Sequence, residues 1–551
     1  MKAICRILDN RVSGLPFLLS PFFLTVISIV YKVPFYDSVG GFQYKDAGAW
    51  ASCTKAMAFN GEFLSGSGEW CLRRPLFPEI ASFVYRINNS LSFVALVLSV
   101  LFGIALYLLF NQARQILSLV GSVTICSATL IYWFIFCCNQ ILTESLAITF
   151  CVLGLVLFLK AKHNDGFKYA YLSIAFIGIS QQIRPGNLFL PLLPLILLFG
   201  KKLMSQLSFL VFSLLIFLLP FLITSMIRLV FQKSEYSNAG NAWASLYGLA
   251  NGNSSWQSAY SIPGIPVGAT DAQISDVIKT ATLDAIQTDI FAVPISIGKN
   301  LIEMLTTYFP LISPISIISP PLSIIINFIL LTLITGRIFL RIKSRWVSKS
   351  DLLVIVFITS TSLVSYAIAW KSEPARALMP TICFIILALV LAIQNQSRTS
   401  EKREPDFSKL AKPVYLPNSK EAIPAIGFLM ALYSIAISSH LLVPLSASGA
   451  SISCGGGAFS LISKSLTVTE MTAVKSFPVY SWSDDLPRIK SGQLIQGLGL
   501  LNGRIISVNA FSDSILKRQE LVSNCFNFKL DGSHLGGFSD SGVKTIVKSG
   551  N

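Results

Sequence analysis

Residues 91–110 read LSFVALVLSVLFGIALYLLF, an uncharged run that is long enough to cross a lipid bilayer as a single helix. A helix needs about 20 apolar residues for that crossing. The whole chain has the same character, since 53% of its 551 residues are hydrophobic and only 13% are charged. Soluble domains are roughly one quarter charged. The sequence therefore predicts an all-α polytopic membrane protein.

Further apolar runs follow along the chain, and about eleven runs in all are expected to form transmembrane helices. They lie near residues 14–33, 90–110, 116–136, 142–161, 168–183, 186–200, 204–231, 321–340, 351–370, 376–394 and 423–445. The first run follows a basic N-terminal segment, and no small-residue cleavage pattern comes after it. We therefore interpret it as an uncleaved anchor whose N-terminus is cytoplasmic.

Lysine and arginine are concentrated on one side of this predicted topology. The loops on that side carry Arg114; Lys160, Lys162 and Lys168; Lys201 and Lys202; five basic residues between 337 and 349; and six between 398 and 420. Because cytoplasmic loops retain positive charge, that side is assigned to the cytoplasm. The C-terminus is then placed on the outer side of the membrane, which is the periplasm if this is a bacterial inner membrane. This topology accounts for the formal net charge of +16, so no nucleic-acid partner is inferred.

The predicted topology divides the chain into two domains. Residues 1–445 form the transmembrane domain, with two large periplasmic loops at 34–89 and 232–320 that are expected to contain helices. Residues 446–551 form a periplasmic tail, in which Gly-rich punctuation and the alternating run 504–508 favour a small β-rich or α/β domain.

Four cysteines lie in the predicted periplasmic segments. Cys53 and Cys71 share the first loop, and Cys454 and Cys525 share the tail. An oxidising exterior would allow one disulfide in each pair. Spacing alone does not establish a bond, so unpaired thiols are the alternative for both pairs.

The first loop contains the main candidate catalytic residue, Asp46. It opens an amphipathic helix that includes Trp50 and ends at Gly61. An aspartate at a helix start is most often an N-cap. However, Arg73 and Arg74 follow in the same loop beside two prolines, and arginine at the outer membrane surface suits a lipid phosphate. Asp46 is therefore either a helix cap or a catalytic carboxylate, and both roles are kept open.

Three further ionisable residues lie at predicted periplasmic ends of spans, namely Glu144, Arg184 and Arg376. An ionisable group near membrane depth indicates function, because taking its charge out of water is costly. Snorkelling at a helix end is the alternative for each arginine. It explains less well why both arginines stand beside proline-marked helix breaks.

The second periplasmic loop carries aromatic residues among small polar ones, including Tyr247 and Trp256. Aromatic rings pack on the C–H faces of sugars, which predicts a pocket for an acceptor or a sugar. An amphipathic helix that lies on the membrane with interfacial aromatics is the alternative.

The sequence does not indicate a metal or nucleotide site. The three histidines, His163, His440 and His534, are isolated, so no zinc cluster is expected. The sequence has no glycine-rich nucleotide-binding loop, which fits a sugar donor that is activated on a lipid.

The order of these features resembles the GT-C superfamily of integral membrane glycosyltransferases. These enzymes use polyprenyl-phosphate-linked sugars and include protein mannosyltransferases, aminoarabinose transferases and arabinosyltransferases. The shared features are the loop-one aspartate with an aromatic residue four positions later, Arg-x-Pro-Leu-aromatic-Pro at 73–78, Thr-Glu-Ser at 143–145, Arg-Pro at 184–185 and Arg-x-x-x-Pro at 376–380. The resemblance covers residues 10–395 in order and topology, and the tail has no counterpart in it.

The resemblance implies roles for individual residues. Asp46 corresponds to the family's catalytic base. Arg73 corresponds to the arginine of an Arg-Pro-Pro-x-Tyr-Pro segment, and Arg74 stands in place of its first proline. Arg184 and Arg376 correspond to arginines that lie near the lipid phosphate.

The implied reaction transfers one monosaccharide from polyprenyl phosphate to a periplasmic glycan, lipid or protein, with inversion at the anomeric carbon. Many relatives have a second acidic residue beside the aspartate, where this chain has Lys45, so a divalent metal is not indicated. Two other classes stay open. One is a polysaccharide polymerase or ligase of the O-antigen type, and the other is a transporter or flippase for lipid-linked sugars.

Overall fold

The computed structural model of the chain describes residues 14–30, 50–51, 53–54, 57–58, 71, 74–88, 90–138, 140–164, 167–187, 189–194, 207–227, 229–230, 240–252, 254–263, 265, 271–307, 349–369, 379–393 and 419–441, together with the backbone of the strands named below. Up to residue 441, these residues are mostly helical.

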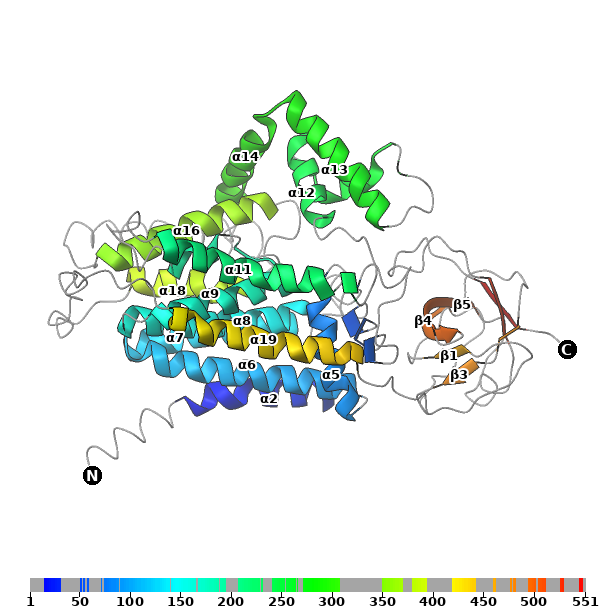
Figure 1. Cartoon of the computed structure of the whole chain (residues 1–551), viewed down its shortest axis with the longest axis horizontal. Helices are drawn as coiled ribbons and strands as arrows, with labels where there is room; N and C mark the ends of the chain where they lie inside the picture. Colours follow the sequence, from blue (N-terminus) through cyan, green and yellow to red (C-terminus); the bar gives the residue numbers. More distant parts are fainter. Residues whose placement is uncertain are drawn as a thin grey trace.

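The largest part of the described structure is a bundle of helices that run side by side (Figure 1). It consists of α2 (Leu15–Val30), α6 (Leu91–Ala113), α7 (Leu119–Cys137), α8 (Thr143–Asn164), α9 (Phe167–Ile183), α11 (Leu207–Ile227), α16 (Lys349–Ala369), α18 (Ile382–Ile393) and α19 (Ser419–Leu441). Four stretches are long and apolar enough to cross a membrane: Leu91–Ala113, Leu119–Cys137, Thr143–His163 and Asp351–Ala369. Shorter apolar helices occupy four more of the predicted runs. The run predicted at 321–340 lies outside the described residues.

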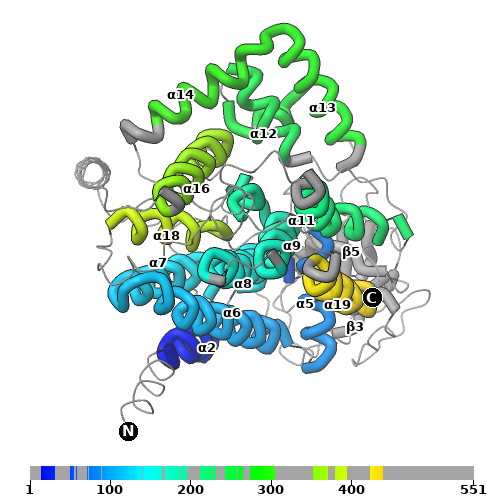
Figure 2. Tube along the Cα trace, turned by 60° about the vertical axis from the view of Figure 1, so that its left-hand side comes forward, coloured from blue at the N-terminus to red at the C-terminus, as the bar shows by residue number. Residues whose placement is uncertain are grey.

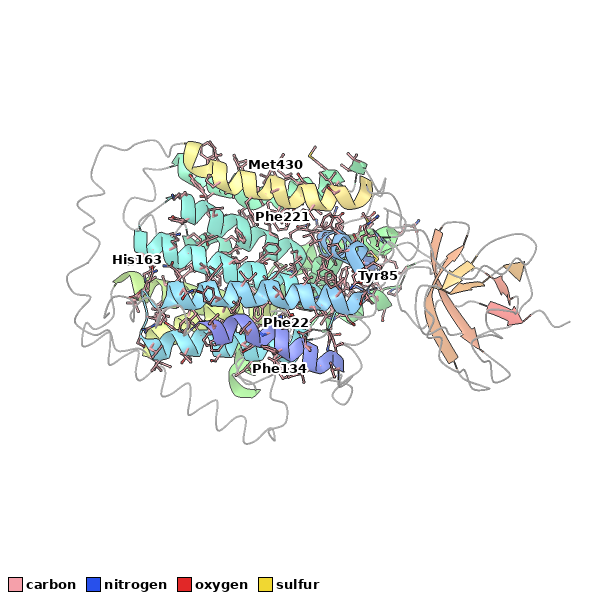
Figure 3. The ribbon with its side chains drawn as sticks, turned by 90° about the horizontal axis from the view of Figure 1, so that it is seen from below. Phe22, Tyr85, Phe134, His163, Phe221 and Met430 are labelled. Atoms are coloured by element: carbon pink, nitrogen blue, oxygen red, sulfur yellow. A yellow bond between two sulfur atoms is a disulfide. The ribbon has the colours of Figure 1, made fainter. Side chains whose placement is uncertain are left out.

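Apolar side chains cover the outside of the bundle as well as its interior. Phe23 on α2, Leu222 on α11 and Met430 on α19 are 53%, 55% and 58% exposed, and Figure 3 shows Met430 at the edge of the bundle. Rows of exposed apolar side chains are unfavourable in water but suit lipid. The surface of the bundle therefore agrees with a membrane-embedded protein.

α8 lies in the middle of the bundle (Figure 2), where it packs against α6 and α9. The neighbouring pair α2 and α6 approach closely at Gly103, because a Cβ atom there would lie 2.3 Å from the Leu18 carbonyl oxygen. Small residues at helix contacts allow such approach inside membranes. Large side chains fill the interior elsewhere, as where Phe102 stacks on Trp133 with ring centroids 4.9 Å apart.

Two polar contacts mark the two ends of the bundle. At one end, Lys162 of α8 forms an ion pair with Asp351 at the start of α16. At the other end, Asn187 after α9 donates a hydrogen bond of 2.9 Å to Thr361 in the second half of α16. We call the first the Lys162 end and the second the Glu144 end, because Glu144 lies in the first turn of α8. α8 and α16 therefore run in opposite directions, as the predicted topology requires.

The predicted loops contain helices of their own. α5 (Leu76–Asn88) belongs to the first loop, and α12 (Gly240–Ala250), η4 (Trp256–Ser261), α13 (Asp271–Thr288) and α14 (Ala292–Thr307) belong to the second. The short 3₁₀ turns η1 (Leu190–Leu192) and η5 (Met379–Thr381) follow α9 and precede α18. In both Figure 1 and Figure 2, α13 and α14 form a pair that projects from the bundle beside α16.

The tail contributes the strands β1 (Phe459–Leu461), β2 (Ser476–Phe477), β3 (Val479–Ser481), β4 (Leu494–Leu501), β5 (Arg504–Phe511), β6 (Phe526–Lys529) and β7 (Thr545–Lys548). They pair in the orders β3-β1-β4-β5 and β2-β6-β7. β4 and β5 form an antiparallel hairpin in which Leu501 pairs with Arg504. β5 includes the alternating run 504–508, but a separate β-rich domain at 446–551 stays a prediction.

Candidate functional site

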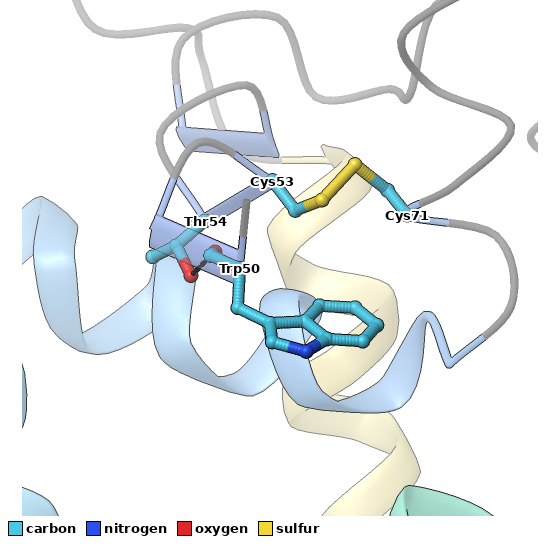
Figure 4. Close-up of a disulfide and its surroundings, with 4 residues drawn as sticks. All are labelled: Trp50, Cys53, Thr54 and Cys71. Carbon is cyan, nitrogen blue, oxygen red and sulfur yellow. Dashed lines mark hydrogen bonds between the residues drawn. A yellow bond between two sulfur atoms is a disulfide. The ribbon is translucent and has the colours of Figure 1, made fainter. Parts of the chain in front are cut away.

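Cys53 and Cys71 form a disulfide in the first loop (Figure 4), with Cα atoms 5.5 Å apart. The Thr54 hydroxyl beside it donates a hydrogen bond of 2.9 Å to the Trp50 carbonyl oxygen. The Trp50 ring meets the Phe77 ring edge-on, with centroids 5.9 Å apart. The pairing predicted for these two cysteines is therefore present, and it ties the turn around Cys53 to the start of α5.

Arg74, three residues after Cys71, connects the first loop to the bundle. Its Nη1 donates a hydrogen bond of 3.5 Å to the Thr143 hydroxyl at the start of α8. The Thr143 hydroxyl in turn donates to Oε2 of Glu144 at 2.9 Å. The second arginine of the Arg-x-Pro-Leu-aromatic-Pro segment is thus joined to the Thr-Glu-Ser segment.

Glu144 also forms an ion pair with Arg184. The Arg184 Nη2 atom lies 3.4 Å from the Glu144 Oε1 atom, and the two side chains are 16% and 0% exposed. A buried carboxylate is costly unless it is paired and hydrogen-bonded, and here each of its oxygens has a partner. Its place in the first turn of α8 adds the favourable field of the helix N-terminus. Glu144 is therefore a buried acidic residue whose two oxygens contact side chains from two different segments, the start of α8 and the end of α9.

The turn after Arg184 is held by a buried polar network. Gln181 bridges it, since its Oε1 accepts from the Gly186 backbone N–H at 3.0 Å and its Nε2 donates to the Asn187 carbonyl oxygen at 2.8 Å. The Asn187 Nδ2 donates to the hydroxyls of Thr361 and Ser362 at 2.9 Å each. The turn is therefore fastened to α16.

A second contact fastens the same turn to η5. The Asn187 backbone N–H donates to the Thr381 hydroxyl at 3.2 Å. A side chain at Gly186 would clash there, because a Cβ atom would lie 2.6 Å from the Thr381 methyl group. Sequence reasoning missed Asn187, although a polar residue two positions after Arg184-Pro185 between apolar runs is a signal that could have identified it.

Glu79 is a second residue that sequence reasoning missed. It lies in the first turn of α5 and is 1% exposed. The available signal was a carboxylate within the apolar segment Leu76-Phe77-Pro78-Glu79-Ile80, directly after the paired arginines. Burial also raises the pKa of Tyr85, in the same helix, to about 12.

Tyr247 and Trp256 belong to a small hydrophobic cluster of the second loop. They pack against the buried residues Ala244, Ala259 and Ile278. The Trp256 ring is also edge-on to Tyr260, with centroids 5.6 Å apart. This cluster is distinct from the core cluster that contains Trp50 and Cys53. The two aromatic residues therefore help to hold the second loop together.

The remaining candidate residues lie outside the described residues, namely Lys45, Asp46, Arg73, Arg376, Cys454 and Cys525. Within the described part of the chain, no group of three or more His, Cys, Asp or Glu side chains is arranged to hold a metal ion. Of the sequence-predicted site residues, the structure brings Arg74, Glu144 and Arg184 together at the Glu144 end.

The apolar helices and their outward-facing apolar side chains define a helical, membrane-embedded protein that carries a buried arginine–glutamate pair at one end. In comparisons with known proteins, the chain matches no family model and no curated sequence. The resemblance to the GT-C superfamily therefore depends only on the ordered motifs of the chain.

Proposed function

We propose that the protein is a membrane glycosyltransferase that transfers one monosaccharide from a polyprenyl phosphate carrier to an acceptor hydroxyl. The observation that carries this proposal is the convergence of Arg74, Glu144 and Arg184. The sequence suggested them as separate features from the first loop, the start of α8 and the end of α9. Arg74 is connected to Glu144 through Thr143, and Glu144 pairs directly with Arg184. These contacts support the proposal that the three residues act in one site.

Arginines at the end of a membrane bundle suit the phosphate of a lipid carrier. A guanidinium presents five N–H donors in a rigid fork, so one side can pair with a carboxylate while another binds phosphate oxygens. In this role Glu144 acts as a positioning residue, because it holds Arg184 where the phosphate would bind. The polyprenyl chain would lie along the apolar surface of the bundle.

The proposed reaction is an in-line displacement at the anomeric carbon. The acceptor hydroxyl oxygen forms a bond to that carbon, its proton passes to the Asp46 carboxylate, and the carbon–oxygen bond to phosphate breaks with its electron pair on polyprenyl phosphate. Negative charge builds up on the phosphate as this bond breaks. Positive groups near the phosphate stabilise the transition state and lower the barrier. This is the role proposed for Arg73, Arg74, Arg184 and Arg376. Positioned general bases contribute about 10²–10⁴-fold.

The disulfide supports an orientation for the protein. Disulfides form and persist in oxidising compartments, and Cys53–Cys71 is linked through Arg74 to the Glu144 end. We therefore place the Glu144 end in the periplasm of a bacterial inner membrane and the Lys162 end in the cytoplasm. The finer topology proposed with it has about eleven spans, a cytoplasmic N-terminus and a periplasmic β-rich domain at 446–551.

The proposal is tested with purified full-length protein and a panel of synthetic polyprenyl-phosphate monosaccharides. Release of free polyprenyl phosphate is measured together with sugar transfer. Arg74→Gln should lower turnover by about 10²-fold or more, whereas Lys279→Gln, on the exposed face of α13, should not change it. If no monophosphate-linked donor is cleaved but a diphosphate-linked oligosaccharide is consumed, the protein is a polymerase or ligase instead. Lipid-linked sugar that crosses liposomes without cleavage would identify a flippase.

A further inference from the structure

α14 has its polarity reversed relative to a helix of a water-soluble domain. Its buried residues include Ser296 and Asn300, which are 4% and 0% exposed. Large apolar residues are exposed instead: Phe291 just before the helix, Ile295 and Ile302 are 67%, 51% and 66% exposed. Positions 291, 295 and 302 share one face of a helix, and positions 296 and 300 lie on the opposite face. One side of α14 is thus an apolar stripe that faces away from the protein.

The buried polar side of α14 makes hydrogen bonds to α12 and α16. The Ser296 hydroxyl donates to the Leu249 carbonyl oxygen of α12 at 2.7 Å. The Asn300 Nδ2 donates to the Ala367 carbonyl oxygen of α16 at 2.8 Å. Leu301 also packs against the buried Tyr366. Because both α16 contacts lie in its last turn, α14 is fixed at the Glu144 end of a helix of membrane-spanning length.

α13, which precedes α14, has an outer face with charged side chains instead of a large apolar stripe. Asp276, Lys279 and Asp284 are exposed on it, as expected for a face in contact with water. Between the two helices, the Asp289 carboxylate accepts a hydrogen bond of 2.9 Å from the Phe291 backbone N–H. The chain therefore turns at this aspartate from a charged outer face to an apolar one.

We infer that the apolar stripe of α14 (Phe291, Ile295 and Ile302) contacts membrane lipid at the Glu144 end of the bundle. Its side chains are exposed to the same degree as Met430 and Leu222 on helices of the bundle itself. Figures 1 and 2 show α14 projecting sideways from α16, where lipid would surround the bundle. The exposed Lys299 lies on the flank of the stripe, in reach of phosphate headgroups.

Lipid contact by α14 has a consequence for the second loop. α14 holds α12 through Ser296 and α16 through Asn300, so burial of the stripe would fix the second loop at the height of the membrane surface. This anchoring holds whether or not the protein transfers sugars, since it depends only on the polarity and position of α14.

Depth-dependent fluorescence quenching tests the inference in the full-length protein reconstituted in liposomes. Ile295→Cys and Ile302→Cys are labelled with an environment-sensitive fluorophore, and Gln287→Cys on the exposed part of α13 is the matched control. The free cysteines in the described part of the chain are buried, and the unsubstituted protein corrects for background labelling. The two quenchers are lipids brominated in the acyl chain and aqueous iodide.

The labels at positions 295 and 302 should be quenched several-fold more by brominated lipid than by iodide, and the label at 287 should show the reverse. Two outcomes would overturn the inference. If iodide quenches positions 295 and 302 as strongly as 287, the stripe faces water. If neither quencher reaches them while the label at 287 responds to iodide, another protein surface covers the stripe.

Discussion

The Arg184 Nη2 atom lies 3.4 Å from the Glu144 Oε1 atom, and this ion pair joins the end of α9 to the start of α8. The Glu144 side chain has no exposed surface. When one partner of such a pair is removed, the other keeps its charge in a largely buried site. We therefore expect the two residues to behave as a unit in stability.

Glu144→Gln should lower the free energy of unfolding by about 3 kcal/mol, because Arg184 would keep its charge but lose the Glu144 carboxylate as a counterion. The measurement is thermal unfolding of the purified protein in detergent. The double variant Glu144→Gln with Arg184→Met should lose less stability than the sum of the two single variants, since neither charge remains. Strictly additive losses would show that the two side chains are not coupled.

Asn187→Ala should destabilise the protein by roughly 1–3 kcal/mol, because the hydroxyls of Thr361 and Ser362 would lose a buried donor. Asn251→Ala is the matched control, since the exposed Asn251, just after α12, donates only to the Tyr247 carbonyl oxygen among the contacts of the described residues. The control should change stability by less than about 0.5 kcal/mol. Equal effects of the two substitutions would mean that the Asn187 network does not fasten the turn after Arg184.

Reduction of the Cys53–Cys71 disulfide should destabilise the protein by about 3 kcal/mol, because the cysteines are 18 residues apart and the closed loop restricts the unfolded chain. The midpoint of thermal unfolding is measured with and without reductant. Cys53→Ser with Cys71→Ser should be less stable than the unsubstituted protein and lose most of the response to reductant. Cys126→Ala, at a buried free cysteine, should keep that response. An unsubstituted protein with no response to reductant would contradict this prediction.

Asp46→Asn should lower the rate of sugar transfer by about 10²–10⁴-fold if the carboxylate takes the proton of the acceptor. Asp276→Asn provides the control, because Asp276 is an exposed aspartate of α13. Both variants are compared in the donor-panel assay after their unfolding temperatures are measured. A loss of less than about tenfold in a folded Asp46→Asn protein would remove Asp46 from the proposed role of general base.

The membrane helices could be predicted from the sequence because length and hydropathy are local properties. Residues 91–110 already satisfy the length that a bilayer requires, and the structure forms a helix over Leu91–Ala113. The Cys53–Cys71 pair could be predicted for a related reason, since the two cysteines are only 18 residues apart in one predicted loop. The alternative of unpaired thiols does not hold for that pair.

The site was predicted only in part. Arg74, Glu144 and Arg184 could be identified because charges beside apolar runs are conspicuous. Asn187 and Glu79 were missed because the role of a polar residue depends on what packs against it. Thr361, Ser362 and Thr381, which receive the hydrogen bonds of Asn187, are distant in the chain.

The sequence by itself determined that this protein is helical and membrane-embedded, and it identified several ionisable residues that stand at the ends of its spans. Only the tertiary structure decided that the Glu144 side chain contacts both Thr143 and Arg184. Only the tertiary structure also showed that the polar residues Ser296 and Asn300 of α14 are buried. The physical reason is that hydropathy is a local property, whereas contacts between segments depend on packing. Hydropathy acts on each segment separately, whereas an ion pair or a buried face depends on which segments the packed bundle brings together.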